Sequence, residues 1–140
     1  MIATTVKQSR KLNELVDRQT ADMCYVYVCT NGDDIDTPDE ANYSLSTIPF
    51  NFYSGIGLPA WSVDALLKML PTSISNDYVG DMDEKDYYLF MDRDKYVDGV
   101  VRFEVFYADM DLNVIEQYSD VELVNALFSM IVRLKELGKI

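Results

Sequence analysis

Apolar residues change their spacing in the last third of the chain. Over residues 101–107 they occupy alternate positions, with Arg102 and Glu104 between them. This alternation is typical of a strand with one buried face. Over residues 121–137 they recur every three or four positions, which is the spacing of one face of a helix. A chain with both patterns must combine β-strands with at least one long helix.

Four further segments are expected to be strands because aromatic and β-branched residues are concentrated in them. Residues 87–91 precede segment 100–107, and residues 112–118 can return from a turn after it. These three segments predict an antiparallel meander. Residues 23–29 predict another strand, which ends at an Asn-Gly turn, and residues 43–48 predict a short one.

Two helices are expected in the first half of the chain. Thr5 and Gln8 have the spacing of a capping box, so we predict a first helix over residues 5–17. A short middle helix is predicted after Ser62, whose hydroxyl can accept from a backbone N–H one turn later. Pro71 ends this helix because its ring disfavours a helical conformation in the residue before it.

The last helix is predicted over residues 120–137. Ser119 and Glu122 have capping-box spacing at its start, and Gly138 follows its end. The expected fold is therefore α+β, with a small antiparallel β-sheet in a meander. An N-terminal helix, a short middle helix and a long C-terminal helix are expected to pack on one face, in a single domain over residues 1–140.

The residue types present limit the chemistry of the chain. Histidine is absent, which removes the commonest general base and a common zinc ligand. Cys24 and Cys29 lie five positions apart in one expected strand, so their side chains point to opposite faces and are expected to stay unlinked. We therefore assign no catalytic residue, no cofactor site and no metal site.

The hydropathy of the chain favours a cytoplasmic location. No apolar run approaches the ~20 residues that a membrane span needs. The first residues show no positively charged start followed by an apolar stretch, so no signal peptide is expected. Membrane binding is not expected.

Negative charge is concentrated in the middle of the chain. The formal net charge is −12, but residues 1–20 carry +2 and residues 119–140 carry zero. Residues 21–118 hold nineteen acidic and five basic residues, a net charge of −14. Such a surface repels nucleic-acid phosphates and anionic membranes. It suits a basic protein partner, or it serves solubility alone.

Two acidic segments are expected to be exposed because neither has a periodicity that would bury it. Residues 33–40 contain five acids and no base, and residues 77–98 contain eight acids against three bases. The candidate interaction surface taken from them consists of Asp33, Asp34, Asp36, Asp81, Asp83 and Glu84.

Carboxylates also leave a second chemistry open, because paired carboxylates can hold Mg²⁺ or transfer protons. The candidates for it are Asp81, Asp83 and Asp86, or Asp109 and Asp111. Residues 109–120 begin like a calcium loop, but Val114 stands where that loop needs glycine, so a hairpin turn is the preferred interpretation. Mimicry of DNA is a third possibility, which requires acids spaced regularly on one face.

Trp61, the only tryptophan, directly precedes the predicted cap at Ser62. A core or hinge role is preferred over stacking on a ligand, because a residue directly before a helix cap can pack onto the first turn.

The order of several motifs resembles that of a known protein group. Residues 20–23 read Thr-Ala-Asp-Met, residues 58–62 read Leu-Pro-Ala-Trp-Ser, and related motifs follow at residues 65–71 and 125–137. The chain resembles small proteins encoded by gut Bacteroidales and their phages or mobile elements, with the Pro-Ala-Trp-Ser helix as the most specific part. The resemblance implies a phage or mobile-element context and carries no activity.

The leading functional hypothesis is a non-enzymatic acidic accessory protein that binds a basic protein partner. A phage-encoded inhibitor or an immunity-like factor would fit this description. The alternative is a carboxylate-based, metal-dependent enzyme.

Overall fold

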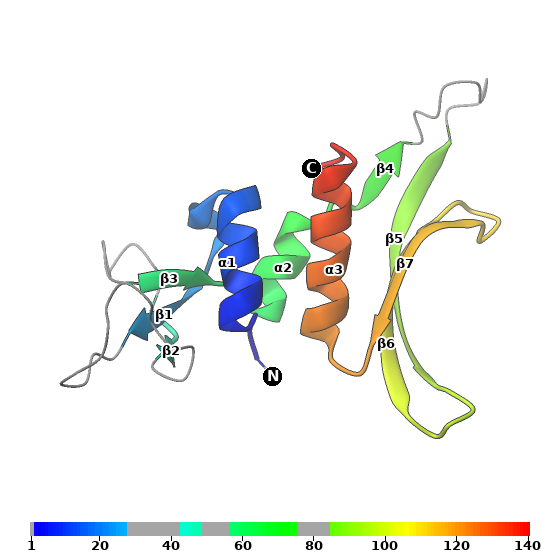
Figure 1. Cartoon of the computed structure of the whole chain (residues 1–140). Coiled ribbons are helices and arrows are strands. Elements are labelled where there is room, and N and C mark those ends of the chain that lie inside the picture. The colour runs from blue at the N-terminus through cyan, green and yellow to red at the C-terminus, as the bar shows by residue number, and fades with distance from the viewer. Residues whose placement is uncertain (1, 28–42, 49–56, 76–84) are drawn as a thin grey trace. The chain divides into compact units, whose positions relative to one another are not determined.

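The computed structural model describes most of the chain, namely residues 2–27, 43–48, 57–75 and 85–140. The chain divides into two compact units, with the boundary between Ala65 and Leu66. Each unit has its own antiparallel sheet, and helices occur near both ends of the chain, so the predicted α+β class is confirmed (Figure 1). The single domain over residues 1–140 stays a prediction.

The first unit combines helix α1 with a three-stranded sheet. Helix α1 (Val6–Leu15) begins at the predicted capping box, in which Gln8 N–H donates to the Thr5 hydroxyl over 3.2 Å and Thr5 N–H donates to Gln8 Oε1 over 3.0 Å. A short 3₁₀ helix, η1 (Arg18–Thr20), leads to the sheet. The strands, in the order β2-β1-β3, are β1 (Met23–Tyr27), β2 (Tyr43–Ser46) and β3 (Gly57–Ala60).

Strand β3 contains Pro59, and proline argues against a central strand because it has no N–H to donate. Among the described strands β3 lies at an edge of its sheet and pairs with β1 alone, where a missing donor can be tolerated. Helix α1 packs against β3. The core of this unit includes the fully or nearly fully buried Ala3, Met23 and Ala60.

The second unit contains the predicted meander. Helix α2 (Val63–Met69) leads into it, and Ala65 N–H donates to the Ser62 hydroxyl over 3.2 Å, which confirms the predicted cap. The sheet has the order β4-β5-β6-β7, so strands consecutive in sequence are neighbours. The remaining elements are β4 (Ser73–Ser75), β5 (Asp86–Lys95), β6 (Val101–Ala108), β7 (Val114–Asp120) and α3 (Leu123–Glu136).

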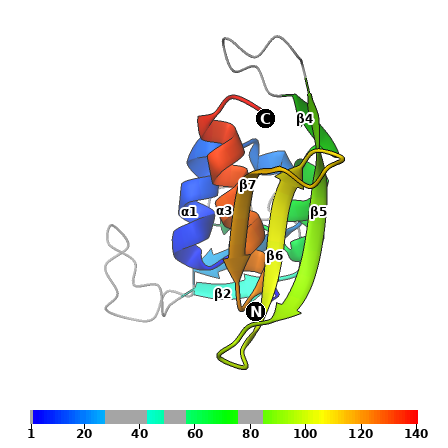
Figure 2. The same cartoon turned by 90° about the vertical axis from the view of Figure 1, so that its right-hand side faces the viewer.

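Helix α3 covers one face of this sheet by packing on β6 and β7 (Figure 2). Val105 and Tyr107 of β6 are fully buried, as the alternating pattern predicted, and so are Leu127, Ile131 and Leu134 of α3. The Tyr107 hydroxyl donates to the backbone carbonyl of Pro71 over 2.7 Å, which satisfies its one polar group in the core.

The start of α3 differs from the prediction. The capping box over residues 119–122 is wrong, because β7 continues to Asp120, which pairs with Phe103 of β6. The helix begins after Glu122, whose side chain makes no cap, and Asp120 Oδ1 accepts from Glu122 N–H over 2.9 Å instead. The end agrees with the prediction, since Gly138 adopts a φ of +69° directly after the C-cap residue Leu137.

Candidate interaction surface

The six acidic residues predicted as an interaction surface lie outside the residues that the structure describes. They are Asp33, Asp34, Asp36, Asp81, Asp83 and Glu84. Among the described residues, the acids that can form an interaction surface are those of β5 and β6.

The two faces of the four-stranded sheet can be assigned from contacts with α3. Glu116 of β7 bonds Arg133 of α3 over 3.1 Å, and Glu116 pairs with Tyr107 of β6, so these side chains share the face that α3 covers. Side chains of a strand alternate between faces. The residues directly before and after Glu116 and Tyr107 in sequence therefore point to the opposite side of the sheet, which we name the outer face. Its residues include Phe90, Asp92, Asp94, Arg102, Glu104, Phe106 and Gln117.

Strand β5 separates its charges between the two faces. Residues 92–95 read Asp-Arg-Asp-Lys, and Asp92 pairs with Glu104 while Asp94 pairs with Arg102. These four paired residues lie on the outer face. Arg93 pairs with Phe103 on the other face, with its guanidinium carbon 5.7 Å from the ring centre. The outer face therefore carries the carboxylates of Asp92 and Asp94, whereas the cations Arg93 and Lys95 lie on the opposite face.

The centre of the outer face is aromatic. Phe90 of β5 pairs with Phe106 of β6, and their rings stack with centroids 5.4 Å apart and planes 14° apart. Both are half-buried. Tyr88, two residues before Phe90 and therefore on the same face, is 38% exposed. In Figure 2 this face is turned to the viewer, and no described helix or strand of residues 66–140 lies over it.

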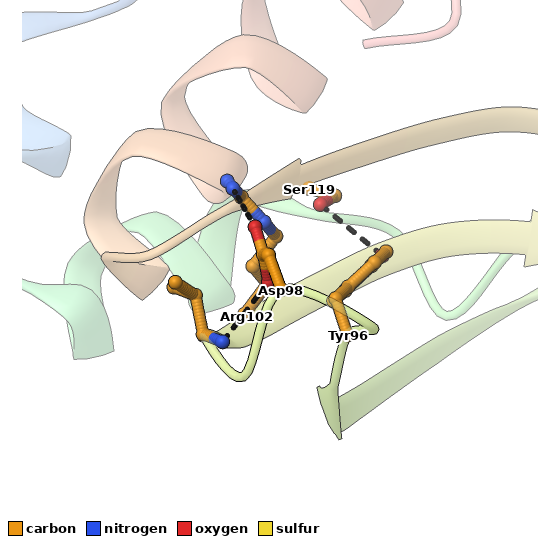
Figure 3. Close-up of polar contacts among 5 residues, drawn as sticks. Tyr96, Asp98, Arg102 and Ser119 are labelled. Atoms are coloured by element: carbon orange, nitrogen blue, oxygen red, sulfur yellow. Dashed lines mark hydrogen bonds and ion pairs between the residues drawn. The ribbon is translucent and has the colours of Figure 1, made fainter.

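A polar cluster at the β5–β6 hairpin adjoins the outer face (Figure 3). The Tyr96 hydroxyl donates to Glu104 and lies 3.4 Å from the Ser119 hydroxyl, so it links the hairpin to β7. Arg102 pairs with Asp98 over 3.4 Å, and its guanidinium carbon lies 5.5 Å from the centre of the Tyr96 ring. The cluster therefore holds the Glu104 carboxylate and the Arg102 guanidinium in fixed positions.

Electrostatics at the cluster agrees with this arrangement. The hydrogen bond to Glu104 raises the pKa of Tyr96, because ionising the phenol would break it. The backbone N–H of Val100, which donates to Asp98 over 2.9 Å, lowers the pKa of Asp98. Asp98 is thus held in its charged form, and the phenol of Tyr96 in its neutral form.

Asp109 organises the turn between β6 and β7. Its Oδ1 accepts from the backbone N–H groups of Asp111 and Asn113 over 3.0 and 2.9 Å, and its Oδ2 accepts from the Asn113 amide over 2.9 Å. The bonds from Asn113 are the main reason why the pKa of Asp109 is lowered. Both carboxylate oxygens accept from the turn itself, so the hairpin interpretation of residues 109–113 is confirmed.

The structure also bears on the predicted metal-binding carboxylates and on membrane crossing. Asp86 begins β5 and is exposed, whereas Asp81 and Asp83 lie outside the described residues. In the described part of the chain, no three or more Asp, Glu or Cys side chains are grouped so that they could hold a metal ion. None of the helices described is long and apolar enough to cross a membrane.

Cys24 is a buried free thiol in β1, and burial raises its pKa, which makes it a poor nucleophile. Cys29 lies outside the described residues.

Trp61 is a core residue, as predicted. It is fully buried, its indole N–H donates to the Thr20 hydroxyl over 2.9 Å, and its backbone N–H donates to the Thr4 hydroxyl over 3.1 Å. Next to it, Ser62 N–H donates to Asp22 Oδ1 over 2.9 Å, and the Ser62 hydroxyl also bonds this carboxylate. The Trp-Ser pair therefore ties together distant segments of the first unit and offers no open site.

Comparisons of the chain with protein-family models, with curated proteins and with solved structures find no significant match. The resemblance to the Bacteroidales group stays a prediction.

Proposed function

We propose that this chain is a non-enzymatic acidic protein that acts in the cytoplasm by binding a basic protein partner. The observation that carries the proposal is the separation of charge on β5, which directs Asp92 and Asp94 to one face and Arg93 and Lys95 to the other. The −14 net charge of residues 21–118 supports the same conclusion.

A basic protein is the partner that this charge favours. Clustered carboxylates speed the encounter with a basic surface and slow the approach of phosphates and anionic lipid headgroups. The effect extends over ~8 Å at physiological ionic strength. An inhibitor or immunity-like factor of a phage or mobile element would use such a surface to cover a basic site on its target.

The proposal is tested by titrating the protein with two short synthetic peptides. One alternates lysine with leucine, and the other alternates glutamate with leucine. Isothermal titration calorimetry at low and at physiological salt should show binding of the lysine peptide only, weaker at the higher salt. Equal affinity for both peptides, or no binding of either at low salt, would refute the proposal.

A thermal-shift measurement distinguishes the proposed binding protein from the alternative, a metal-dependent enzyme that uses carboxylates. Mg²⁺, Mn²⁺ and Ca²⁺ are compared with NaCl at equal ionic strength. The proposed binding protein should show no stabilisation by a divalent cation beyond that of NaCl. A specific stabilising shift would favour the enzyme.

A further inference from the structure

We infer that the partner docks on the outer face of β5 and β6, and that the docking segment carries apolar as well as basic side chains. This inference rests on the proposed function and adds to it a location and a second chemical requirement.

The apolar requirement follows from the stacked rings at the centre of the face. Phe90 and Phe106 are half-buried, and Tyr88 on the same face is 38% exposed. Protein interfaces are enriched in aromatic residues. The contacts that contribute most to binding energy cluster at an apolar centre from which the partner excludes water. A purely cationic segment would leave these rings without an apolar counterpart to bury them.

The basic requirement follows from the charges beside those rings. Asp92, Asp94 and Glu104 lie on the outer face, and Arg102, the one cation that the described strands place there, is already paired with Asp98. A partner surface with lysine or arginine beside its apolar residues complements both features. A second copy of this chain presents carboxylates against carboxylates, which is repulsive, so a self-complementary dimer through this face is disfavoured.

The face is ordered before a partner arrives. Strands β5 and β6 are paired continuously from Tyr88 to Lys95, and Tyr96 links their hairpin to Ser119 of β7 (Figure 3). A surface held in this way loses little conformational entropy on binding, so less of the interaction free energy is spent on ordering it.

The location is tested by backbone NMR of the ¹⁵N-labelled chain, titrated with the lysine–leucine peptide and with a lysine–glycine peptide of equal charge. The lysine–leucine peptide should shift amide resonances of β5, β6 and Gln117, and should bind at least several-fold more tightly than the lysine–glycine peptide. Equal affinities would overturn the apolar requirement. Shifts confined to residues 28–42 or 76–84 would overturn the location.

A charge placed on the face gives a second readout. Gln117 pairs with Phe106 and is exposed, so Gln117→Lys puts a cation on the outer face. Gln19→Lys is the matched control, because Gln19 is an exposed residue of the first unit. Binding of the lysine–leucine peptide should weaken several-fold in Gln117→Lys and by much less in Gln19→Lys. Equal weakening of both variants would overturn the location.

Two outcomes separate this inference from the proposed function. Peptide binding that remains salt-dependent but ignores Gln117→Lys refutes the location alone. The absence of any binding refutes the proposed function as well. Sedimentation velocity tests the remaining occupant, since a wild-type dimer whose stability changes in Gln117→Lys but not in Gln19→Lys would assign the face to a second copy and overturn the inference.

Discussion

At the turn between β6 and β7, one residue adopts a backbone conformation that its side chain disfavours. Leu112 has a φ of +62°, in the left-handed region that suits glycine and asparagine. Its N–H donates to the Asp109 carbonyl over 3.0 Å, so the turn imposes this angle. The side chain is 65% exposed and contributes little packing in return.

Leu112→Asn should therefore raise the free energy of unfolding by about 0.5 to 1 kcal/mol, because asparagine tolerates the left-handed region. Urea denaturation gives the value. Leu112→Ala is the control, since alanine keeps the steric penalty and should bring no comparable gain. A loss of stability in Leu112→Asn would show that the leucine side chain packs usefully.

Asp109, at the same turn, should make part of the folding stability depend on pH in the acidic range. Its lowered pKa means that the folded state favours the charged carboxylate, so this stabilisation is present above the unfolded pKa of about 3.9 and is lost as pH falls through the lower, folded value. Asp109→Asn cannot titrate at this position. The stability difference between the wild type and this variant should be constant near neutral pH and should shrink in acid. A difference that does not change down to about pH 3 would contradict the assignment.

The two residues of this turn differ in how far sequence could predict them. A run of Asp-x-Asp-x-Asn favours a turn because short polar side chains bond nearby backbone groups, and Asp109 does so. The positive φ of Leu112 could not be predicted, because leucine rarely adopts it and only the strand register on both sides enforces it.

At the scale of elements, helix α3 was predictable because its apolar stripe repeats over four turns. Its first residue was not, because a strand and a helix compete for residues 119–122, and the pairing of Asp120 with Phe103 settles the competition. Strands β3 and β4 were missed for a related reason. Each is short and lies at a sheet edge, where pairing with one neighbour suffices and the sequence needs no alternation.

The buried stripe of α3 should dominate the stability of its unit. Leu127 and Ile131 are both fully buried. Truncating either one to Ala should cost on the order of 2–5 kcal/mol, from lost apolar burial and from the cavity left behind. Leu137→Ala is the control, because Leu137 is 37% exposed at the end of the helix and should cost far less. Equal denaturation midpoints for all three variants would show that this helix face does not form the core.

At the scale of the whole molecule, the sequence predicted an acidic protein and placed its interaction surface on segments 33–40 and 77–98. The structure adds a face on β5 and β6, which part of the second segment forms. The signal for it was present in the alternation Asp92-Arg93-Asp94-Lys95, since a strand sends alternate residues to opposite sides. Which side α3 covers could not be read from the sequence, because it depends on long-range packing.

The central claim is that carboxylates of the outer face steer a basic partner. It is tested most directly by the association rate constant of the lysine–leucine peptide, measured by stopped flow over a series of salt concentrations. The double variant Asp92→Asn/Asp94→Asn is compared with Glu14→Gln/Asp111→Asn, which removes the same charge from two exposed positions that belong to neither β5 nor β6.

The account predicts that the wild-type rate falls steeply with salt. The Asp92→Asn/Asp94→Asn variant should start several-fold lower at low salt and depend less on salt, within the ~10 to ~1,000-fold that steering can supply. The Glu14→Gln/Asp111→Asn variant should stay close to the wild type. Identical rates and salt slopes for the two double variants would contradict the claim, since the acids would then act only through net charge.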